Sequence, residues 1–198
     1  VIGTLVGEMA LDAIAAGETV TDPVLSVTAN PFFLPIDNQG FQAMFLAGVF
    51  GHRSTHNWDN TQPIEDDNSP ELLTDMALIN VGPIQMLSIP GELLPELAVG
   101  GYDGSMHHAP GYDFIDPNNE DPPDMTAAPQ GPYLKDRMTG EYNWIIGMGN
   151  DELGYIIPEY DFKVHDGAPF ILEADGDHYE ETNSLGPLTA ALLEAEAD

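Results

Sequence analysis

The sequence predicts an α/β protein with a mixed sheet and flanking helices. Short runs of strand-forming residues alternate along the chain with segments of helical periodicity, which is the pattern of this class. Apolar residues make up 42% of the 198 residues, enough to build a hydrophobic core. No apolar run approaches the roughly 18 residues that a membrane-spanning helix needs. No repeat or change of composition divides the chain, so we expect residues 1–198 to form a single domain.

The first 16 residues have the spacing of an amphipathic helix, and Gly17 is expected to end it. The apolar residues that set this spacing are Val1, Ile2, Leu5, Val6, Met9 and Ile14. No capping residue precedes the helix, so we expect it to continue a polypeptide that extends upstream.

The next segments predict a strand, a helix and a loop. Residues 24–29 (VLSVTA) have strand composition, and the prolines within residues 30–35 are expected to end that strand. Residues 38–50 predict a helix that Asp37 or Asn38 caps. Residues 51–70 are polar and rich in turn-forming residues, which predicts a loop.

Two further strands are predicted at residues 73–80 and 84–89, joined by a tight turn. The tripeptide Pro90–Glu92 breaks the second strand, and residues 93–99 predict a short helix. In α/β proteins, site residues gather where a strand ends in a turn. The residues of this break are therefore candidates for a site.

The second half of the chain begins with residues 100–140, which are dense in Gly, Pro, Asp and Asn. They predict an acidic loop inserted into the domain, and loops of this length are commonly functional. Residues 144–149 predict a buried strand, and the sequence NDELGYIIP that follows predicts another strand end and turn. Residues 186–197 predict a final short helix.

The chain is strongly acidic, with 34 Asp and Glu against four Lys and Arg, a net charge of −30. This charge excludes nucleic acids and anionic membrane surfaces as partners, because both bind basic residues. A chain so charged repels itself unless salt or bound cations screen it. We therefore expect a high-salt, marine or calcium-containing environment; an ordinary acidic protein is the alternative.

The absence of certain residue types and motifs from the sequence excludes several kinds of site. The chain has no cysteine, so it forms no disulfide, thiol nucleophile or Cys-type zinc site. It contains no GxSxG, Walker A or GxGxxG motif, and its six histidines form no HExxH. His52 and His56 are four residues apart in a segment that is not expected to be helical. The adjacent His107 and His108 point apart on an extended chain, so neither pair predicts a metal site.

Residues 116–124 (DPNNEDPPD) crowd carboxylate and amide oxygens, the ligands that calcium prefers. The segment lacks the glycine and the closing glutamate that an EF-hand loop requires. Calcium on this loop is one interpretation, and a solvated acidic loop is the other.

Glu92 and Tyr155 both lie where a predicted strand ends, so we expect them to converge on one face of a sheet. Taken alone, Glu92 is also typical of an acidic residue at a helix N-terminus, where the helix dipole favours it. Taken alone, Tyr155 is also typical of a half-buried core residue. The two interpretations of each residue stay open at this stage.

Four segments resemble the neutral/alkaline ceramidase family, in particular its bacterial ceramidase-like branch. They are LPIDNQGFQAMFLAGVF (Leu34–Phe50), IQMLSIPGE (Ile84–Glu92), GMGNDELGYIIP (Gly147–Pro158) and HYEETNSLGP (His178–Pro187). The family has corresponding segments in the same order and with similar spacing. The resemblance covers most of the chain and implies the C-terminal part of a larger ceramidase-like catalytic domain.

The resemblance implies a zinc-dependent amidase that hydrolyses an N-acyl amide bond. In the family, two histidines, the glutamate of the PGE motif and a tyrosine hold the zinc. By motif, the glutamate corresponds to Glu92 and the tyrosine to Tyr155, so both are expected as metal ligands. The tyrosine of the family's YEG motif corresponds to Tyr179, which is expected as a catalytic residue.

The chain departs from the family in ways that define a second hypothesis. No segment matches the family's two zinc histidines or its serine, and residues 100–140 match nothing in it. We therefore expect the missing ligands to come from an upstream half of the same hydrolase, present as a separate chain or lost, and this chain alone to be inactive. The alternative is a non-catalytic extracellular structural or assembly protein that carries calcium. The family and the charge both favour an extracellular or periplasmic location.

Overall fold

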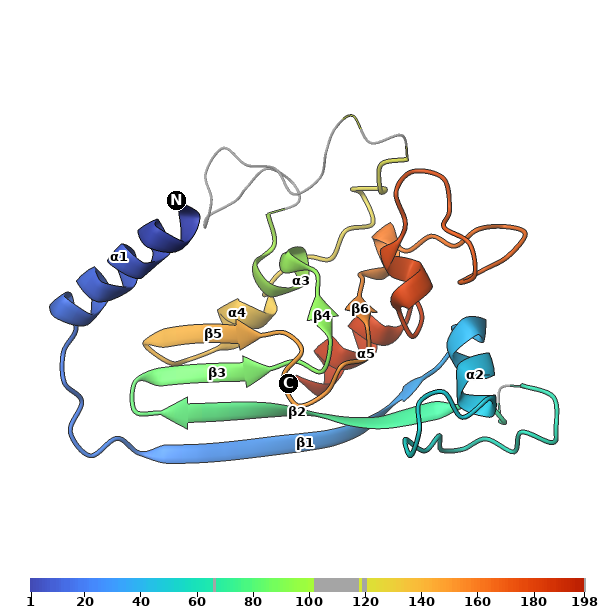
Figure 1. Ribbon diagram of the computed structural model, residues 1–198, viewed down its shortest axis with the longest axis horizontal. Helices are drawn as coiled ribbons and strands as arrows, with labels where there is room; N and C mark the ends of the chain where they lie inside the picture. The colour runs from blue at the N-terminus through green and yellow to red at the C-terminus, as the bar shows by residue number, and fades with distance from the viewer. Residues whose placement is uncertain (66, 102–117, 119–120, 198) are drawn as a thin grey trace.

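The computed structural model describes residues 1–65, 67–101, 118 and 121–197 and confirms the α/β class (Figure 1). Its main sheet is mixed and has the strand order β1–β2–β3–β5. The strands are β1 (Leu25–Pro35), β2 (Glu71–Val81), β3 (Ile84–Ser88) and β5 (Tyr142–Ile146). β2 is antiparallel to β1 and β3, whereas β5 is parallel to β3. A parallel pair requires a crossover connection, and this crossover carries one strand of a second sheet.

The second sheet has two parallel strands, β4 (Glu92–Leu93) and β6 (Tyr155–Ile156). The helices are α1 (Ile2–Ala16), α2 (Gln39–Leu46), α3 (Pro95–Val99), α4 (Leu134–Arg137) and α5 (Thr189–Glu196). Two 3₁₀ turns, η1 (Glu159–Asp161) and η2 (Glu180–Asn183), follow β6. Among the described residues, no helix is both long and apolar enough to cross a membrane.

Four sequence predictions differ from the observed elements. The strand predicted as buried over residues 144–149 is β5, whose Trp144 and Ile146 are exposed because β5 lies at an edge of the sheet. β1 continues through Pro31 to Pro35, because β1 is an edge strand and a proline there leaves no ladder hydrogen bond unmade. The helix predicted over residues 38–50 ends at Leu46, although Asn38 caps it as predicted and accepts a hydrogen bond from Phe41 N. Helix α4 lies inside residues 100–140, where only a loop was predicted.

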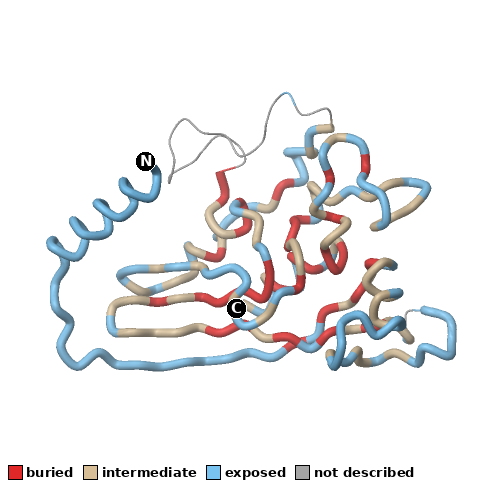
Figure 2. The backbone as a smooth tube through the Cα atoms, in the orientation of Figure 1, coloured by how far each residue is buried: buried red, intermediate tan, exposed pale blue. Residues whose placement is uncertain are grey.

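The hydrophobic core lies on one face of the main sheet. Its strand residues include Phe32, Leu34, Leu72, Met76 and Leu87, which alternate along β1, β2 and β3 as a half-buried sheet requires. Helices α3, α4 and α5 contribute Leu97, Leu134 and Leu193 to the same cluster. Figure 2 shows that the buried segments gather around the second sheet, whereas α1 and the first half of β1 are exposed.

Candidate functional site

The second sheet brings Glu92 and Tyr155 side by side. The two residues are paired in its parallel register, although 63 positions separate them in the sequence. The backbone fixes this pairing, because Glu92 N donates to Gly154 O (2.9 Å) and Leu94 N donates to Ile156 O (3.2 Å). The two residues therefore converge as the sequence predicts, but they are the first residues of the strands of a separate sheet and do not lie where strands end.

Two glycines allow the close packing of this site. A Cβ atom at Gly91 would stand 2.6 Å from Gly154 O. Gly154 has a φ of +88°, and a Cβ atom there would stand 1.8 Å from Asn183 O. No side chain fits between these three backbone segments, so glycine at both positions lets the PGE turn, β6 and η2 meet.

The segment before β6 is held in place by polar contacts that cross the molecule. Arg53 donates two hydrogen bonds to the Asp151 carboxylate, at 2.5 and 2.6 Å. Thr74 on β2 donates a third (2.9 Å). Burial disfavours the charged form of Asp151, but these hydrogen bonds outweigh burial and lower its pKa. The ionised Asp151 thus ties the approach to Tyr155 to the main sheet.

Tyr179 completes the group from a third segment. Its ring meets the Tyr155 ring edge to face, with centroids 6.1 Å apart and an interplanar angle of 74°. Burial raises the pKa of the Tyr155 hydroxyl, as do the nearby Glu92, Tyr179 and Glu180 and a hydrogen bond to Glu92. Tyr155 therefore stays protonated at neutral pH and can donate a hydrogen bond. Glu92 and Tyr179 are exposed and Tyr155 is half-buried, so the group is open to solvent.

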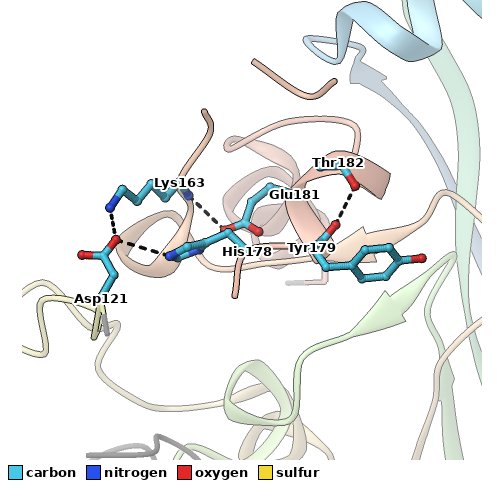
Figure 3. Close-up of polar contacts among 6 residues, drawn as sticks. All are labelled: Asp121, Lys163, His178, Tyr179, Glu181 and Thr182. Atoms are coloured by element: carbon cyan, nitrogen blue, oxygen red, sulfur yellow. Dashed lines mark hydrogen bonds and ion pairs between the residues drawn. The ribbon is translucent and has the colours of Figure 1, made fainter. Parts of the chain in front are cut away.

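Behind Tyr179 lies a buried polar cluster (Figure 3). His178 is buried, and its Nδ1 atom lies 2.7 Å from Oε1 of the equally buried Glu181. Its Nε2 atom lies 3.4 Å from an oxygen of Asp121, which also forms an ion pair with Lys163. Lys163 N donates to Glu181 as well (3.0 Å). Figure 3 shows the Tyr179 ring pointing away from this cluster, while Thr182 Oγ1 donates to Tyr179 O (2.7 Å).

Two further carboxyl groups near this cluster have raised pKa values. Burial raises the pKa of Glu96, on α3, to about 7, and Asp161 adds to the effect. Burial, together with the negative Glu181, raises the pKa of Asp161 to about 6. Sequence reasoning missed this group, although the spacing of His178 and Glu181, three residues apart, is a signal that could have found their pairing.

The residues for a metal ion are only partly present. Glu92 and Tyr155 offer two oxygen donors of the kind that zinc accepts, whereas a zinc site needs three or four protein ligands. Within the described parts of the chain, no group of three or more His, Asp or Glu side chains could hold a metal ion. His107 and His108 lie outside the described residues. The donor set is therefore compatible with zinc but incomplete.

Of the candidate calcium loop, residues 116–124, the structure describes only residues 118 and 121–124. Of its carboxylates, Asp121 pairs with Lys163, and Asp124 accepts hydrogen bonds from Thr126 N (2.9 Å) and Thr126 Oγ1 (2.7 Å). Both side chains already have protein partners, so neither one favours the calcium interpretation.

Comparison with known proteins adds no relative. No protein-family model matches the chain, and neither a curated protein nor a solved structure is significantly similar to it. The resemblance to the ceramidase family therefore stays a prediction that depends on the four sequence segments and on the geometry described above.

Proposed function

We propose that Glu92, Tyr155 and Tyr179 form one half of a zinc-dependent amidase site of the ceramidase type, which hydrolyses an N-acyl amide bond. The observation that supports the proposal is the pairing of Glu92 with Tyr155 on adjacent parallel strands, with Tyr179 in edge-to-face contact with Tyr155. Three residues selected by three separate motifs meet at one solvent-facing edge.

In this proposal Glu92 and Tyr155 would hold the zinc ion, and further ligands come from a second polypeptide segment. Zinc, when bound, supplies Lewis-acid chemistry that polarises the amide carbonyl and lowers the pKa of a water molecule. The chain's own contribution is geometric and electrostatic. Glu92 places a negative charge at the edge of the sheet, and the backbone contacts of β4 and β6 fix its position.

As the alternative to ligating zinc, the protonated Tyr155 hydroxyl would donate a hydrogen bond to the carbonyl oxygen as negative charge develops there. Tyr179, in edge-to-face contact with the Tyr155 ring, would lie beside the reacting amide as the second tyrosine of the site. In hydrolysis the oxygen of water forms a bond to the carbonyl carbon, the carbon–nitrogen bond breaks, and a proton from water goes to the leaving amine. The products are a carboxylate and an amine, and the step needs no redox partner.

The first test is the denaturing intact mass of the purified material, followed by an assay with zinc and a fluorogenic N-acyl amide. A second polypeptide that carries histidines, together with zinc-dependent hydrolysis, is the expected result. Glu92→Gln and Tyr155→Phe should each lower kcat by about 10²-fold or more, as loss of an electrostatic group at a reacting centre does.

A matched control is Glu159→Gln, which removes one exposed carboxylate outside the site and should leave hydrolysis unchanged. Equal activity of the Glu92→Gln variant and the unaltered protein would overturn the proposal. The proposal would also be overturned by a two-chain sample that binds zinc through the histidines of the second polypeptide and yet hydrolyses no N-acyl amide.

A further inference from the structure

The first two residue rows of the main sheet present an apolar surface that nothing in the described structure covers. Paired residues of neighbouring strands share a face, so the registers define these rows directly. We call the eight residues of the two rows the open face: Leu25, Val81, Ile84 and Tyr142 in one row, and Val27, Ile79, Met86 and Trp144 in the next. Leu25, Val27, Tyr142 and Trp144 are between 54% and 69% exposed.

On the opposite face of the sheet, the row of side chains between these two rows is polar. Ser26, Asn80, Gln85 and Asn143 form a row there, in which Gln85 donates to Asn80 and Asn80 donates to Ser26, both at 3.0 Å. A sheet normally buries its apolar face and exposes its polar face. Here the apolar open face is exposed on its two edge strands, and of the polar row only Gln85 is buried. An exposed apolar patch of this kind marks an interaction surface, which indicates that another element covers the open face.

Helix α1 likewise has an apolar surface without a packing partner in the described structure. None of its 15 residues is buried. It contains Gly3 and Gly7, each of which weakens a helix by about 1 kcal/mol relative to alanine. An isolated helix of this length is marginal in water even with a favourable sequence, so α1 needs a surface to pack against. Its apolar stripe consists of Ile2, Leu5, Val6, Met9 and Ala13, at the i, i+3, i+4, i+7 spacing of a packed helix.

The connection between the two places α1 within reach of the open face. Val24 O accepts a hydrogen bond from Gly82 N (2.9 Å), which anchors the end of the linker at the β2–β3 turn. A Cβ atom at Gly82 would stand 3.3 Å from both Val20 Cγ1 and Pro23 Cβ, so the linker lies against the same turn from Val20 onward. Figure 1 shows α1 extending from this end of the sheet without touching it.

We propose that α1 folds back and packs its apolar stripe on the open face of its own chain. The helix is long enough to cross all four strands, because a 15-residue helix is about 22 Å long and four strands span about 14 Å. A second copy is a poorer occupant, since two chains of net charge −30 repel each other. Residues 17–19 act as the hinge, and the inference does not depend on a metal or a substrate.

The test uses Trp144 as a reporter. The chain has two tryptophans, so Trp58→Phe leaves Trp144 alone on the open face. We expect acrylamide to quench Trp144 several-fold less than a free tryptophan amide. Met9→Asp, in the stripe, should restore strong quenching, whereas Leu11→Asp, about 200° around the helix, should not. Strong quenching in the Trp58→Phe protein, unchanged by Met9→Asp, would overturn the proposal.

A second measurement guards against misfolded variants and identifies the occupant. The chain has no cysteine, so Met9→Cys with Met86→Cys gives one defined pair for a short bismaleimide. We expect a cross-link within the monomer, and little with the control pair Leu11→Cys and Met86→Cys. Cross-linked dimers would assign the face to the helix of a second copy and overturn the proposal, as would the absence of any cross-link.

Discussion

At the residue scale, Gly154 is the position of the site where a substitution is expected to be most disruptive. Its backbone is in the left-handed region, and the carbonyl oxygen of Asn183 occupies the space that a Cβ atom would need. We predict that Gly154→Ala lowers the free energy of unfolding by about 3 kcal/mol or more, since backbone strain and a steric overlap add together. Urea unfolding followed by circular dichroism measures this change.

Gly167→Ala is the matched control for that variant. A Cβ at Gly167 would meet only the His165 ring, at 3.5 Å or more, which is ordinary van der Waals contact. This control should change the free energy of unfolding by about 0.5 kcal/mol or less. A loss below about 1 kcal/mol in Gly154→Ala would contradict the packing described for β6 and η2.

Glu96 gives the chain a pH dependence whose sign is fixed by burial. Its pKa is raised from the ordinary 4.5 to about 7 in the folded protein. Its favourable contribution is therefore complete below pH 4.5 and is lost as pH rises through about 7, because only the unfolded chain ionises freely there. We predict that the effect of Glu96→Gln on the free energy of unfolding is more favourable at pH 8 than at pH 4.5, by on the order of 3 kcal/mol.

Urea unfolding at the two pH values measures this difference, and Glu173→Gln is the control, because it removes an exposed carboxylate elsewhere. Asp161, with its pKa of about 6, acts in the same direction and remains in both variants. If Glu96→Gln and Glu173→Gln respond to pH alike, the neutral, buried state of Glu96 is wrong.

At the element scale, Asn38 joins α2 to the segment that carries Tyr179. Its Oδ1 caps the helix at Phe41 N (3.0 Å), and its Nδ2 donates to the carbonyl oxygens of Thr182 (3.1 Å) and Ser184 (2.8 Å). The side chain is completely buried. One amide group therefore satisfies a helix end and two carbonyl oxygens of the η2 region.

We predict that Asn38→Ala lowers the free energy of unfolding by about 2–4 kcal/mol, because it removes a cap and leaves buried carbonyls without a donor. Thermal and urea unfolding measure the loss. The exposed Asn60→Ala should be nearly neutral. A loss no larger than that of an ordinary cap, about 1 kcal/mol, would mean that the contacts to Thr182 and Ser184 add nothing.

The elements that the sequence predicts are those whose signal is local. The cap at Asn38 and the strands β2 and β3 follow from capping chemistry and from runs of apolar residues. The two-residue strands β4 and β6 have no such signal, because their pairing depends on contacts between segments far apart in sequence. The extension of β1 through Pro31 could not be predicted for the same reason: the proline is tolerated only because β1 lies at an edge.

The candidate site follows the same division. The turn at Glu92 and the strand end at Tyr155 can be identified from sequence, and their convergence can be expected for an α/β sheet. The contact of Tyr179 with Tyr155 and the burial of His178 arise only when η2 packs beneath β6. The sequence can therefore identify Glu92 and Tyr155 as candidate site residues, but it cannot predict the buried polar cluster around His178.

At the scale of the whole molecule, the charge and the apolar surface act against each other. A net charge of −30 favours an expanded chain, whereas the core and the open face favour a compact one. Only four basic residues are available to balance 34 acidic ones. Two of the four, Arg53 and Lys163, already pair with Asp151 and Asp121, so most carboxylates depend on solvent ions.

We therefore predict that salt stabilises this protein strongly. Raising NaCl from 0.1 to 1 M shortens the screening length from about 10 to about 3 Å, which weakens repulsion between carboxylates and should raise Tm by about 10 °C. Differential scanning fluorimetry measures the shift, with an equal osmolarity of sucrose as the control for solvent effects other than screening. CaCl₂ at the same ionic strength separates the two explanations of the acidity: an additional rise indicates bound calcium, whereas an equal rise indicates screening alone. A Tm that stays constant between 0.1 and 1 M NaCl would mean that self-repulsion does not limit stability, and that the acidic surface has another origin.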